Sequence, residues 1–432
     1  MTARPRGDPD ELDVLIVVGL GPTHPSNETT FVPRVESEVG RLESVIVHRP
    51  GLEIERLTPQ NHDELLFDDL LSPTAAKREH DYFVEVMRDR GVQVLHFTDL
   101  LIETLDHPEA RQYVLENTIN RLYLGPLLAP AVEEWAAELD SAALASVCIE
   151  GLTLGDWQRV SPTSSLVAQT LAENEFLISP LPNHLFARDA SAWIYGGVAI
   201  NSMKRESRRR EPLHYSAIYQ WHPRFAGADF TRWTNGTSGP IRSVEGGDIM
   251  VLGDGLLAIG LSERTNPQGV ERLASRLFAQ GQADHVLAVM LPHQREFMHL
   301  DTVLTQVDRD SFIIYPPIRS ARTISLVRDG DRPRLVMDDL PLEQALPRAL
   351  GRPIRFIIPE GTEAELAREQ WNDGFNMLAL SPGQVVAYDR TPRSIRALEQ
   401  AGIEVFSVFG SELGRGRGGP RCMSCPVRRA QV

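Results

Sequence analysis

Cysteine is scarce in this chain, which has three cysteines in 432 residues: Cys148, Cys422 and Cys425. An odd and sparse count argues against a disulfide framework and indicates a reducing compartment. Long apolar runs are also missing near the start, where the stretch from Val14 to Leu20 is too short to span a bilayer. This stretch follows several acidic residues, whereas a secretory signal begins with positive charge. We therefore expect a cytoplasmic protein.

Positive charge is in short supply, because 44 Lys and Arg stand against 59 Asp and Glu and give a net charge of -15. This balance argues against nucleic acid and anionic membranes as partners. The basic run Lys204–Arg210 is compatible with a solvated face or a nucleic-acid patch, and the overall charge disfavours the patch. A small cationic substrate, by contrast, would be attracted to such a surface.

The length of the chain predicts one large domain or a domain with an insertion. Residues 1–30 are expected to form a poorly ordered extension, and residues 31–432 the main domain. Near its start we predict a strand at Ser44–His48, a helix from about Pro73 to Arg90 and a strand at Val92–His96. Apolar residues then recur at three- and four-residue spacing without convincing strands, which predicts a helical insertion over 98–165.

Four later segments have the pattern of a hairpin, with two apolar runs around a turn. They are Ala192–Asn201, Ile249–Ile259 (turning at Asp254-Gly255), Thr302–Tyr315 (turning near Asp308–Asp310) and Phe375–Tyr388 (turning at Pro382-Gly383). A helix and a strand follow two of these hairpins, at Gln268–Gln280 with His285–Met290 and at Pro392–Ala401 with Ile403–Val408. The recurring ββαβ order predicts an α/β domain assembled from several similar units.

A polar or acidic segment stands directly before each hairpin. These segments are Asn183 to Asp189, Glu245-Gly246-Gly247-Asp248, His299-Leu300-Asp301 and Trp371-Asn372-Asp373-Gly374. If the units pack around a common axis, the segments meet at its centre and line a cavity with carboxylates and one histidine. Gly246 and Gly247 would permit a close approach of the backbone there. Each motif alone also fits an ordinary turn or core pair, so the prediction depends on their joint occurrence.

Cys422 and Cys425 form a Cys-x-x-Cys pair after a segment rich in Gly and Arg. A structural zinc site needs four ligands, and no second pair completes one. The preceding segment is not a thioredoxin-like unit, so a redox pair is disfavoured. Two inert thiols remain an alternative, whereas Arg415, Arg417 and Arg421 would favour a nucleophilic thiolate. The residues alone do not choose between the two cysteines.

Several ordered motifs make the resemblance to a known family specific. They are Ser37-Glu38-Val39-Gly40, the segment Asp63–Asp69, Leu185-Phe186-Ala187-Arg188-Asp189, Glu245–Asp248, His299-Leu300-Asp301-Thr302, Arg368-Glu369-Gln370-Trp371, and the tail Glu412–Gly419 with Cys422-Met423. From about residue 31 to the C-terminus the chain resembles the arginine deiminases of the guanidino-group modifying (pentein) superfamily. The resemblance implies a five-bladed α/β propeller of ββαβ repeats with an inserted α-helical bundle.

The resemblance also implies roles for individual residues. It makes Cys422, and not Cys425, the nucleophile, His299 the general acid and base, and Glu245 the support of the histidine. The guanidinium would bind Asp189 and Asp301. Positions that hold or line the substrate are matched by Arg208 and Arg264 (its carboxylate), a mobile Arg417, and Asn183 and Phe186. Two departures are Ala187 where Thr is common, and Pro420-Arg421 where the family often has Gly-His.

The implied activity is hydrolysis of free L-arginine to L-citrulline and ammonia through a covalent amidino intermediate on the cysteine. No cofactor and no metal are implied. The partner is the small-molecule substrate, and we expect a homo-oligomer. The alternatives are a related hydrolase of agmatine or dimethylarginine, an amidinotransferase, or a non-catalytic arginine-binding regulatory protein.

Overall fold

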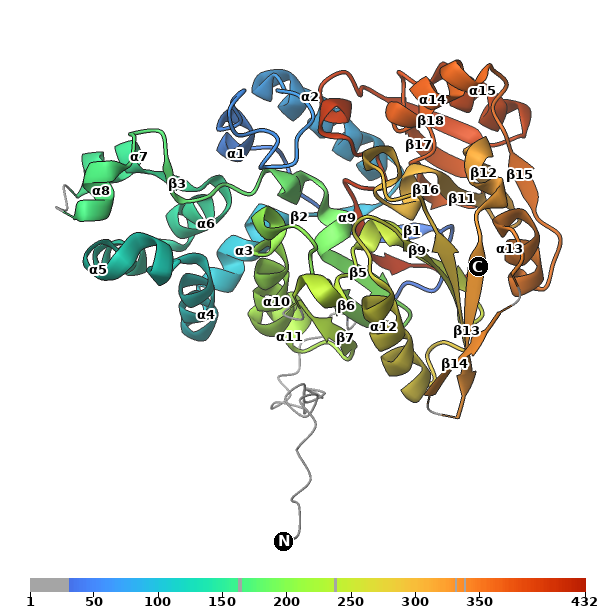
Figure 1. Cartoon of the computed structure of the whole chain (residues 1–432), viewed down its shortest axis with the longest axis horizontal. Coiled ribbons are helices and arrows are strands. Elements are labelled where there is room, and N and C mark those ends of the chain that lie inside the picture. Colours follow the sequence, from blue (N-terminus) through green and yellow to red (C-terminus); the bar gives the residue numbers. More distant parts are fainter. Residues whose placement is uncertain (1–30, 162–164, 237–238, 331, 338) are drawn as a thin grey trace, which may run out of the picture.

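The computed structural model describes residues 31–161, 165–236, 239–330, 332–337 and 339–432. The predicted extension, residues 1–30, lies outside the described residues, as do positions 162–164 of the predicted helical insertion. The chain forms several small sheets with helices between their strands, so the fold is mixed α/β, as the sequence predicts (Figure 1).

Five sheets share one order of strands. Each contains an antiparallel pair of strands, and the second strand of the pair as given below pairs in parallel with a third strand. The sheets are β5 (Ser191–Ile194), β6 (Gly197–Ile200) and β7 (Thr231–Asn235); β8 (Ile249–Gly253), β9 (Leu256–Leu261) and β10 (His285–Met290); β11 (Leu304–Asp308), β12 (Ser311–Ile314) and β15 (Arg355–Ile357); β16 (Leu378–Ser381), β17 (Gln384–Tyr388) and β18 (Glu404–Val408); and β19 (Cys425–Arg429), β1 (Leu42–Val47) and β2 (Gln93–His96).

Parallel pairing requires a crossover, and each second strand is joined to its parallel partner through at least one helix. The crossover helices are α1 (Leu52–Glu55), α2 (Pro73–Arg88), α10 (Glu211–Trp221), α11 (Pro223–Ala226), α12 (Pro267–Ala279), α13 (Leu342–Leu350) and α15 (Pro392–Gln400). Two strands without a counterpart in the other sheets, β13 (Thr323–Asp329) and β14 (Arg332–Val336), extend the second sheet beyond β10. The sequence analysis predicts no element in this segment.

Local chemistry explains why the predicted hairpins form. Asp254 and Gly255 both have a positive φ, of 49° and 73°, which a two-residue hairpin turn with the twist of its strands requires. Gly383, which follows Pro382, has a φ of 78°. This fits a turn in which proline fixes φ at the first central position and the second central residue is left-handed. Both hairpin predictions are confirmed.

The helical segment predicted over 98–165 contains helices almost throughout. They are α3 (Phe97–Leu105), α4 (Pro108–Thr118), α5 (Arg121–Glu138), α6 (Ser141–Glu150) and α7 (Leu154–Val160), and α8 (Leu166–Thr170) follows. The two-residue strand β3 (Leu152–Thr153), which pairs with β4 (Phe176–Ile178), interrupts them. Figure 1 shows this segment projecting to one side of the sheets. Its status as a separate inserted unit stays a prediction.

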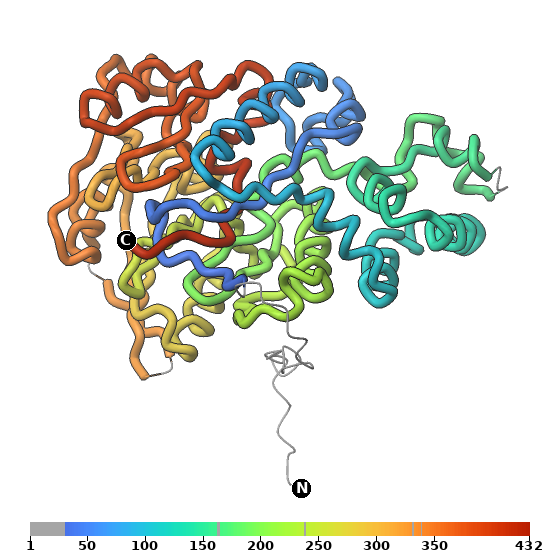
Figure 2. Tube along the Cα trace, turned by 180° about the vertical axis from the view of Figure 1, so that it is seen from behind, coloured from blue at the N-terminus to red at the C-terminus, as the bar shows by residue number. Residues whose placement is uncertain are grey.

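The fifth sheet is built from both ends of the described chain. The C-terminal strand β19 pairs antiparallel with β1, where Ile46 lies opposite Cys425 and Val45 opposite Pro426. Figure 2 shows the red C-terminal strand beside the blue N-terminal one. This pairing fixes the segment that immediately precedes β19, and Cys422 lies in that segment. Among the described residues, no helix is both long and apolar enough to cross a membrane.

Candidate active site

The predicted site residues stand directly before the first strands of different sheets. Asp189 lies on the short helix α9 (Ala187–Ala190) before β5, and Glu245 precedes the 3₁₀ turn η5 (Gly246–Asp248) before β8. His299 precedes the turn η7 (Leu300–Thr302) before β11. Asp301 lies within that turn, and Cys422 comes shortly before β19. The side chains of all five are buried inside the molecule.

His299 lies between two carboxylates. Its Nε2 is 2.9 Å from Oε2 of Glu245, and its Nδ1 is 3.7 Å from Oδ1 of Asp189. Burial alone would lower the pKa of His299, but Asp189, Glu245 and Asp248 outweigh it and raise the pKa to about 9. Burial opposes ionisation of Glu245 as well, yet the hydrogen bond to His299 and the nearby Arg264 lower its pKa to about 2. The pair is therefore an imidazolium and a carboxylate at neutral pH.

Gly247 lets the histidine approach the backbone closely, as the sequence predicts. A Cβ at this position would lie 2.6 Å from Nδ1 of His299 and 3.0 Å from Oδ1 of Asp189. At Gly246 it would lie 2.0 Å from the carbonyl oxygen of Arg188. The backbone N–H of Gly247 donates to Oδ1 of Asp189 at 3.2 Å, so the glycine also orients that carboxylate.

Arg208 is held entirely by protein groups. Its Nη1 donates to Oδ2 of Asp189 at 2.7 Å, and its Nε and Nη2 donate to the two carboxylate oxygens of Glu211 at 2.9 and 2.8 Å. Its Nη2 also donates to the carbonyl oxygen of Asn183 at 3.3 Å. Arg208 therefore positions Asp189, and its predicted contact with a substrate carboxylate stays a prediction.

Arg264 is held more loosely. It is 2% exposed, and its nearest carboxylate oxygens belong to Glu263 and Glu245 at 3.7 and 3.8 Å. Its Nε makes no hydrogen bond among the described residues. Burial lowers the pKa of Arg264 to about 10, although Glu245 acts in the opposite direction. Arg264 therefore keeps donors for a ligand.

Cys422 contacts two site residues. Its Sγ lies 3.6 Å from Oδ2 of Asp301, and Nδ2 of Asn376 donates to the sulfur at 3.1 Å. Burial, followed by the negative charges of Asp301, Asp189 and Asp373, raises the pKa of the thiol well above its usual range. Arg421 acts in the predicted direction and lowers this pKa, but burial and the three carboxylates outweigh it.

Cys425 faces a different environment. Its Sγ donates to the carbonyl oxygen of Ser191 at 3.2 Å, and it begins strand β19. Among the described residues it contacts none of the carboxylates around His299. All three cysteines are free thiols. The geometry therefore distinguishes the two cysteines, which the residues alone could not.

Sequence reasoning missed the ion pairs that hold the cysteine loop. Arg421 donates from Nη1 to Oδ2 of Asp301 at 2.7 Å and from Nε to Oε2 of Glu38 at 3.0 Å. Its third nitrogen, Nη2, donates to the carbonyl oxygen of Ile249 at 2.7 Å. One oxygen of Asp301 is thus occupied, while Oδ1 is buried and makes no hydrogen bond among the described residues.

Asn376 is a second residue that the sequence analysis did not single out. Besides the sulfur of Cys422, its Nδ2 donates to the carbonyl oxygen of Asp301 at 3.0 Å. Its Oδ1 accepts from the backbone N–H groups of Arg421 and Cys422 at 3.1 and 3.2 Å. One side-chain amide therefore holds both the nucleophile loop and the Asp301 turn. The only signal in the sequence was its place beside the Trp371–Gly374 motif.

The other predicted substrate residues, Asn183, Phe186 and Arg417, contact segments that lie far from them in the chain or at its other motifs. Asn183 donates from Nδ2 to the carbonyl oxygen of Leu65 at 2.7 Å. Phe186 stacks on Phe67 with ring centroids 6.0 Å apart, and a Cβ at Gly418 would lie 2.3 Å from its ring. Arg417 stacks its guanidinium on the ring of Trp371, 3.6 Å from the centroid.

One group of side chains has the spacing of a metal site. Ligand atoms of Asp189, Glu245 and His299 lie within 4.8 Å of one another. However, the guanidinium of Arg208 contacts Asp189 at 2.7 Å and lies 3.9 Å from Glu245, and Arg264 lies 3.8 Å from Glu245. Two fixed cations would repel a divalent ion at close range. The donor set therefore fits a planar cation held by hydrogen bonds better than a metal.

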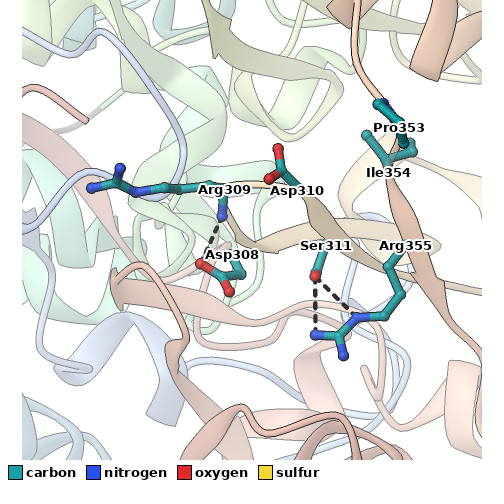
Figure 3. Close-up of a pocket in the computed structure, with 7 residues that line it drawn as sticks. All are labelled: Asp308, Arg309, Asp310, Ser311, Pro353, Ile354 and Arg355. Carbon is teal, nitrogen blue, oxygen red and sulfur yellow. Dashed lines mark hydrogen bonds between the residues drawn. The ribbon is translucent and has the colours of Figure 1, made fainter.

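Two hollows of the surface lie outside this buried centre. The smaller, of 490 Å³, lies at the turn between β11 and β12 beside the start of β15 (Figure 3). Its lining contains none of the predicted site residues. The larger, of 1430 Å³, lies between the helical segment and the residues around Leu65 and Arg205. Its lining includes Leu65, whose carbonyl oxygen accepts from Asn183, but none of the predicted site residues.

A model of the arginine deiminase family matches residues 63–429. The chain belongs to the arginine deiminase family. The matched range contains every residue that the sequence analysis assigned to the site. Membership supports an enzyme that modifies guanidino groups, by hydrolysis or by transfer of the amidino group.

Solved structures share the fold of this family member at low sequence identity. One is the amidinotransferase SxtG from Microseira wollei, of the saxitoxin biosynthetic pathway, with a TM-score of 0.54 and 15% identity over 93% of this chain and 98% of that chain. Another is a variant of dimethylarginine dimethylaminohydrolase in an adduct with S-methyl-L-thiocitrulline, with a TM-score of 0.50 and 15% identity over 89% of this chain and 99% of that one. At these identities the two comparisons show a shared fold alone.

Proposed function

We propose that this enzyme hydrolyses free L-arginine to L-citrulline and ammonia, with Cys422 as the nucleophile and no metal or organic cofactor. One observation carries the proposal: the Cys422 thiol and the His299 imidazolium lie in one buried site with the carboxylates of Asp189 and Asp301. A guanidinium is planar and cationic, and carboxylates bind it through charge-assisted hydrogen bonds.

Arrival of the substrate would activate the sulfur. In the free site burial, together with the carboxylates of Asp301, Asp189 and Asp373, raises the pKa of Cys422, so the group is a thiol. A guanidinium bound between Asp189 and Asp301 adds positive charge beside the sulfur and lowers the pKa of the thiol again. The nucleophile is therefore formed where its target is bound, and the resting enzyme is protected from oxidation.

The first half-reaction displaces ammonia. The Cys422 thiolate adds to the guanidinium carbon, and a C–S bond forms in a tetrahedral adduct. The imidazolium of His299 gives its proton to a terminal nitrogen, the C–N bond breaks and ammonia departs. The enzyme now carries a cationic amidino thioether, and His299 is neutral.

The second half-reaction uses water. Neutral His299 takes a proton from a water molecule as the oxygen attacks the same carbon. The C–S bond then breaks, the hydroxyl proton of the adduct passes to the departing sulfur, and citrulline and the Cys422 thiol are released. Glu245 stabilises the imidazolium in both steps through its 2.9 Å contact with Nε2.

The contacts of the free site refine the binding roles. Asp301 would receive the guanidinium through Oδ1, because Arg421 occupies Oδ2. Asp189 would bind the other side, held in place by Arg208. We assign the substrate carboxylate to Arg264 together with Arg417. The guanidinium nitrogens of Arg417 make no hydrogen bonds within the described part of the chain. Asn183 and Phe186 would form the wall of the site.

We further infer that the five sheets are the blades of a propeller. Supporting contacts join β5 to β19, β1 to β16, β16 to β11, η7 to η5, and η5 to α9, which precedes β5. These contacts begin and end at the unit that contains β5, so they connect the five sheets in a ring. A closed ring of five units would place the polar segment of each unit at the common centre.

The nucleophile assignment is tested by two matched variants. Cys422→Ser should lose at least about a thousandfold in turnover, because a hydroxyl is a far weaker nucleophile at neutral pH. Cys425→Ser should keep most of the activity, since its sulfur contacts Ser191 instead of the site. Acid quench of a slow variant such as His299→Ala, followed by peptide mass measurement, should place the amidino adduct on Cys422. Substantial activity in Cys422→Ser protein would overturn the assignment.

The substrate is tested by a panel. Purified protein is incubated with L-arginine, agmatine and asymmetric dimethylarginine, and citrulline, ammonia, carbamoylputrescine and dimethylamine are measured. Citrulline and ammonia from arginine support the proposal. Dimethylamine production would indicate a dimethylarginine hydrolase, and carbamoylputrescine an agmatine hydrolase. Ornithine release that depends on an added amine would indicate amidino transfer, and binding without any product would indicate a non-catalytic arginine sensor.

A further inference from the structure

Two oppositely charged side chains near the proposed site are buried without hydrogen-bond partners. Asp373 is 2% exposed, and neither of its carboxylate oxygens accepts a hydrogen bond within the described part of the chain. Arg417 is 4% exposed, and none of its three nitrogens donates one there. Nor do the two side chains form an ion pair with each other. Buried charges normally find partners, so groups left open in this way are poised for a ligand.

The backbone of both residues is strained. Asp373 and Arg417 have φ values of 62° and 64°, in the left-handed region that few residues other than glycine adopt. Such strain persists where the surroundings enforce it, and it is common at sites that clamp ligands. The surrounding structure therefore enforces the backbone conformation of both residues.

The position of Asp373 links the two ends of the site. It lies between Trp371, whose ring supports the guanidinium of Arg417, and Asn376, whose amide donates to the sulfur of Cys422. The carbonyl oxygen of Asp373 accepts from the backbone N–H of Asn376 at 3.0 Å, which closes this turn. Asp373 therefore lies in the segment that contacts both Cys422, through Asn376, and Arg417, through Trp371.

The charge state of Asp373 suits a cationic partner. Burial raises its pKa to about 7, while Arg417 and Arg390 act in the opposite direction. A carboxyl group with this pKa ionises readily when a positive group comes within hydrogen-bond distance. Arg390 is already engaged, since it donates to the carbonyl of Gly410 and to the side chain of Asn372.

The open groups are complementary to a zwitterion. Asp189 and Asp301 take the guanidinium in the proposed function, and Arg264 and Arg417 offer donors to a carboxylate. Asp373 is then the carboxylate that these contacts leave without a partner, and it can bind one further cationic group. We propose that Asp373 binds the α-ammonium group of the substrate, so that the site selects free α-amino acids with a guanidino side chain. The inference rests on the proposed function, because it uses the same site.

Binding to the inactive Cys422→Ser protein tests the inference without turnover. The probes are L-arginine and 5-guanidinopentanoic acid, which is arginine without its α-ammonium group. With Asp373 intact, arginine should bind about ten- to a hundredfold more tightly, as expected for one charge-assisted hydrogen bond in a buried site. Adding Asp373→Asn should remove most of that preference by weakening arginine alone, and Asp373→Glu should restore part of it.

The matched control is Asp68→Asn, which removes a carboxylate near the same wall that already pairs with Arg295. In that variant the ratio of the two affinities should stay unchanged. If Asp373→Asn weakens both probes equally, Asp373 is a structural residue and the inference is overturned. It is also overturned if arginine binding does not change. Failure of the proposed function looks different, because the protein with Cys422 would then bind arginine and release no citrulline.

Discussion

The charge of His299 is the property of a single residue on which both half-reactions depend. Its pKa of about 9 means that the imidazolium, the form required for the first proton transfer, dominates at neutral pH. The specificity constant kcat/KM should therefore fall as the pH rises through about 9. His299 also contributes to the free energy of unfolding. This contribution is fully present below the pKa of histidine in the unfolded chain, about 6.5, and is lost as the pH rises through about 9.

Replacing Glu245 with Gln should move this alkaline limit. The substitution keeps the shape of the side chain but removes the charge that contacts Nε2 of His299 at 2.9 Å. The pKa of His299 should fall, and the alkaline limb of kcat/KM should shift by about one to two pH units toward acid. The control is Glu263→Gln, a neighbour that pairs with Arg205 and Arg264. An unmoved limb in Glu245→Gln protein would show that another group sets it.

The sequence could predict a site residue where a local motif marks it, and could not where its role depends on distant contacts. His299 and Glu245 stand in short motifs before predicted hairpins, and those motifs could be read locally. The choice of Cys422 over Cys425 required a family resemblance, since both stand in one tail. Arg421 and Asn376 could not be assigned, because their roles depend on contacts between segments far apart in the chain.

At the scale of elements, the turn before β8 is a sensitive point. Gly247 has a backbone conformation that alanine can adopt, so Gly247→Ala should fold. The added methyl group, however, would lie 2.6 Å from His299 and must displace it or Asp189. A displacement of this size costs about a hundredfold in kcat/KM when the reacting groups are misaligned. The measurements are kcat/KM and the melting temperature.

Gly196→Ala provides the comparison. This glycine lies in the turn between β5 and β6, and a Cβ there would be 3.3 Å from the flexible end of Arg34 and 3.4 Å from that of Gln282. Its activity should stay close to that of the parent enzyme. Equal activities in the two variants would show that His299 tolerates the shift and that the close approach of Gly247 has no catalytic role.

The elements that could be predicted were those with local signals. The hairpin turns at Asp254-Gly255 and Pro382-Gly383 could be predicted because they contain residues that accept a positive φ. The pairing of β1 with β19 has no such signal, since nothing near Leu42–Val47 specifies a partner almost at the other end of the chain. For this reason the fifth sheet could not be predicted from the order of the other units.

At the scale of the whole molecule, β19 couples the core to the nucleophile. Val427 is fully buried in this strand, and Val427→Ala should lower the free energy of unfolding by about 1–3 kcal/mol through loss of packing. Urea denaturation followed by tryptophan fluorescence measures the change, and activity should be lost over the same range. Val432→Ala, at a 51% exposed position, should have little effect. Loss of activity well before the fluorescence transition would show that the strand opens independently.

The pairing of β1 with β19 also sets an order of events during synthesis. A ribosome makes β1 among the first described residues, and β2 can cover one edge of it soon afterwards. The other edge exposes unpaired N–H and C=O groups until Cys425–Arg429 emerges. Exposed edges invite pairing with other chains, so the nascent protein is vulnerable to aggregation for most of its translation. The nucleophile is made almost together with the strand that covers this edge, because Cys422 precedes β19 by only a few residues.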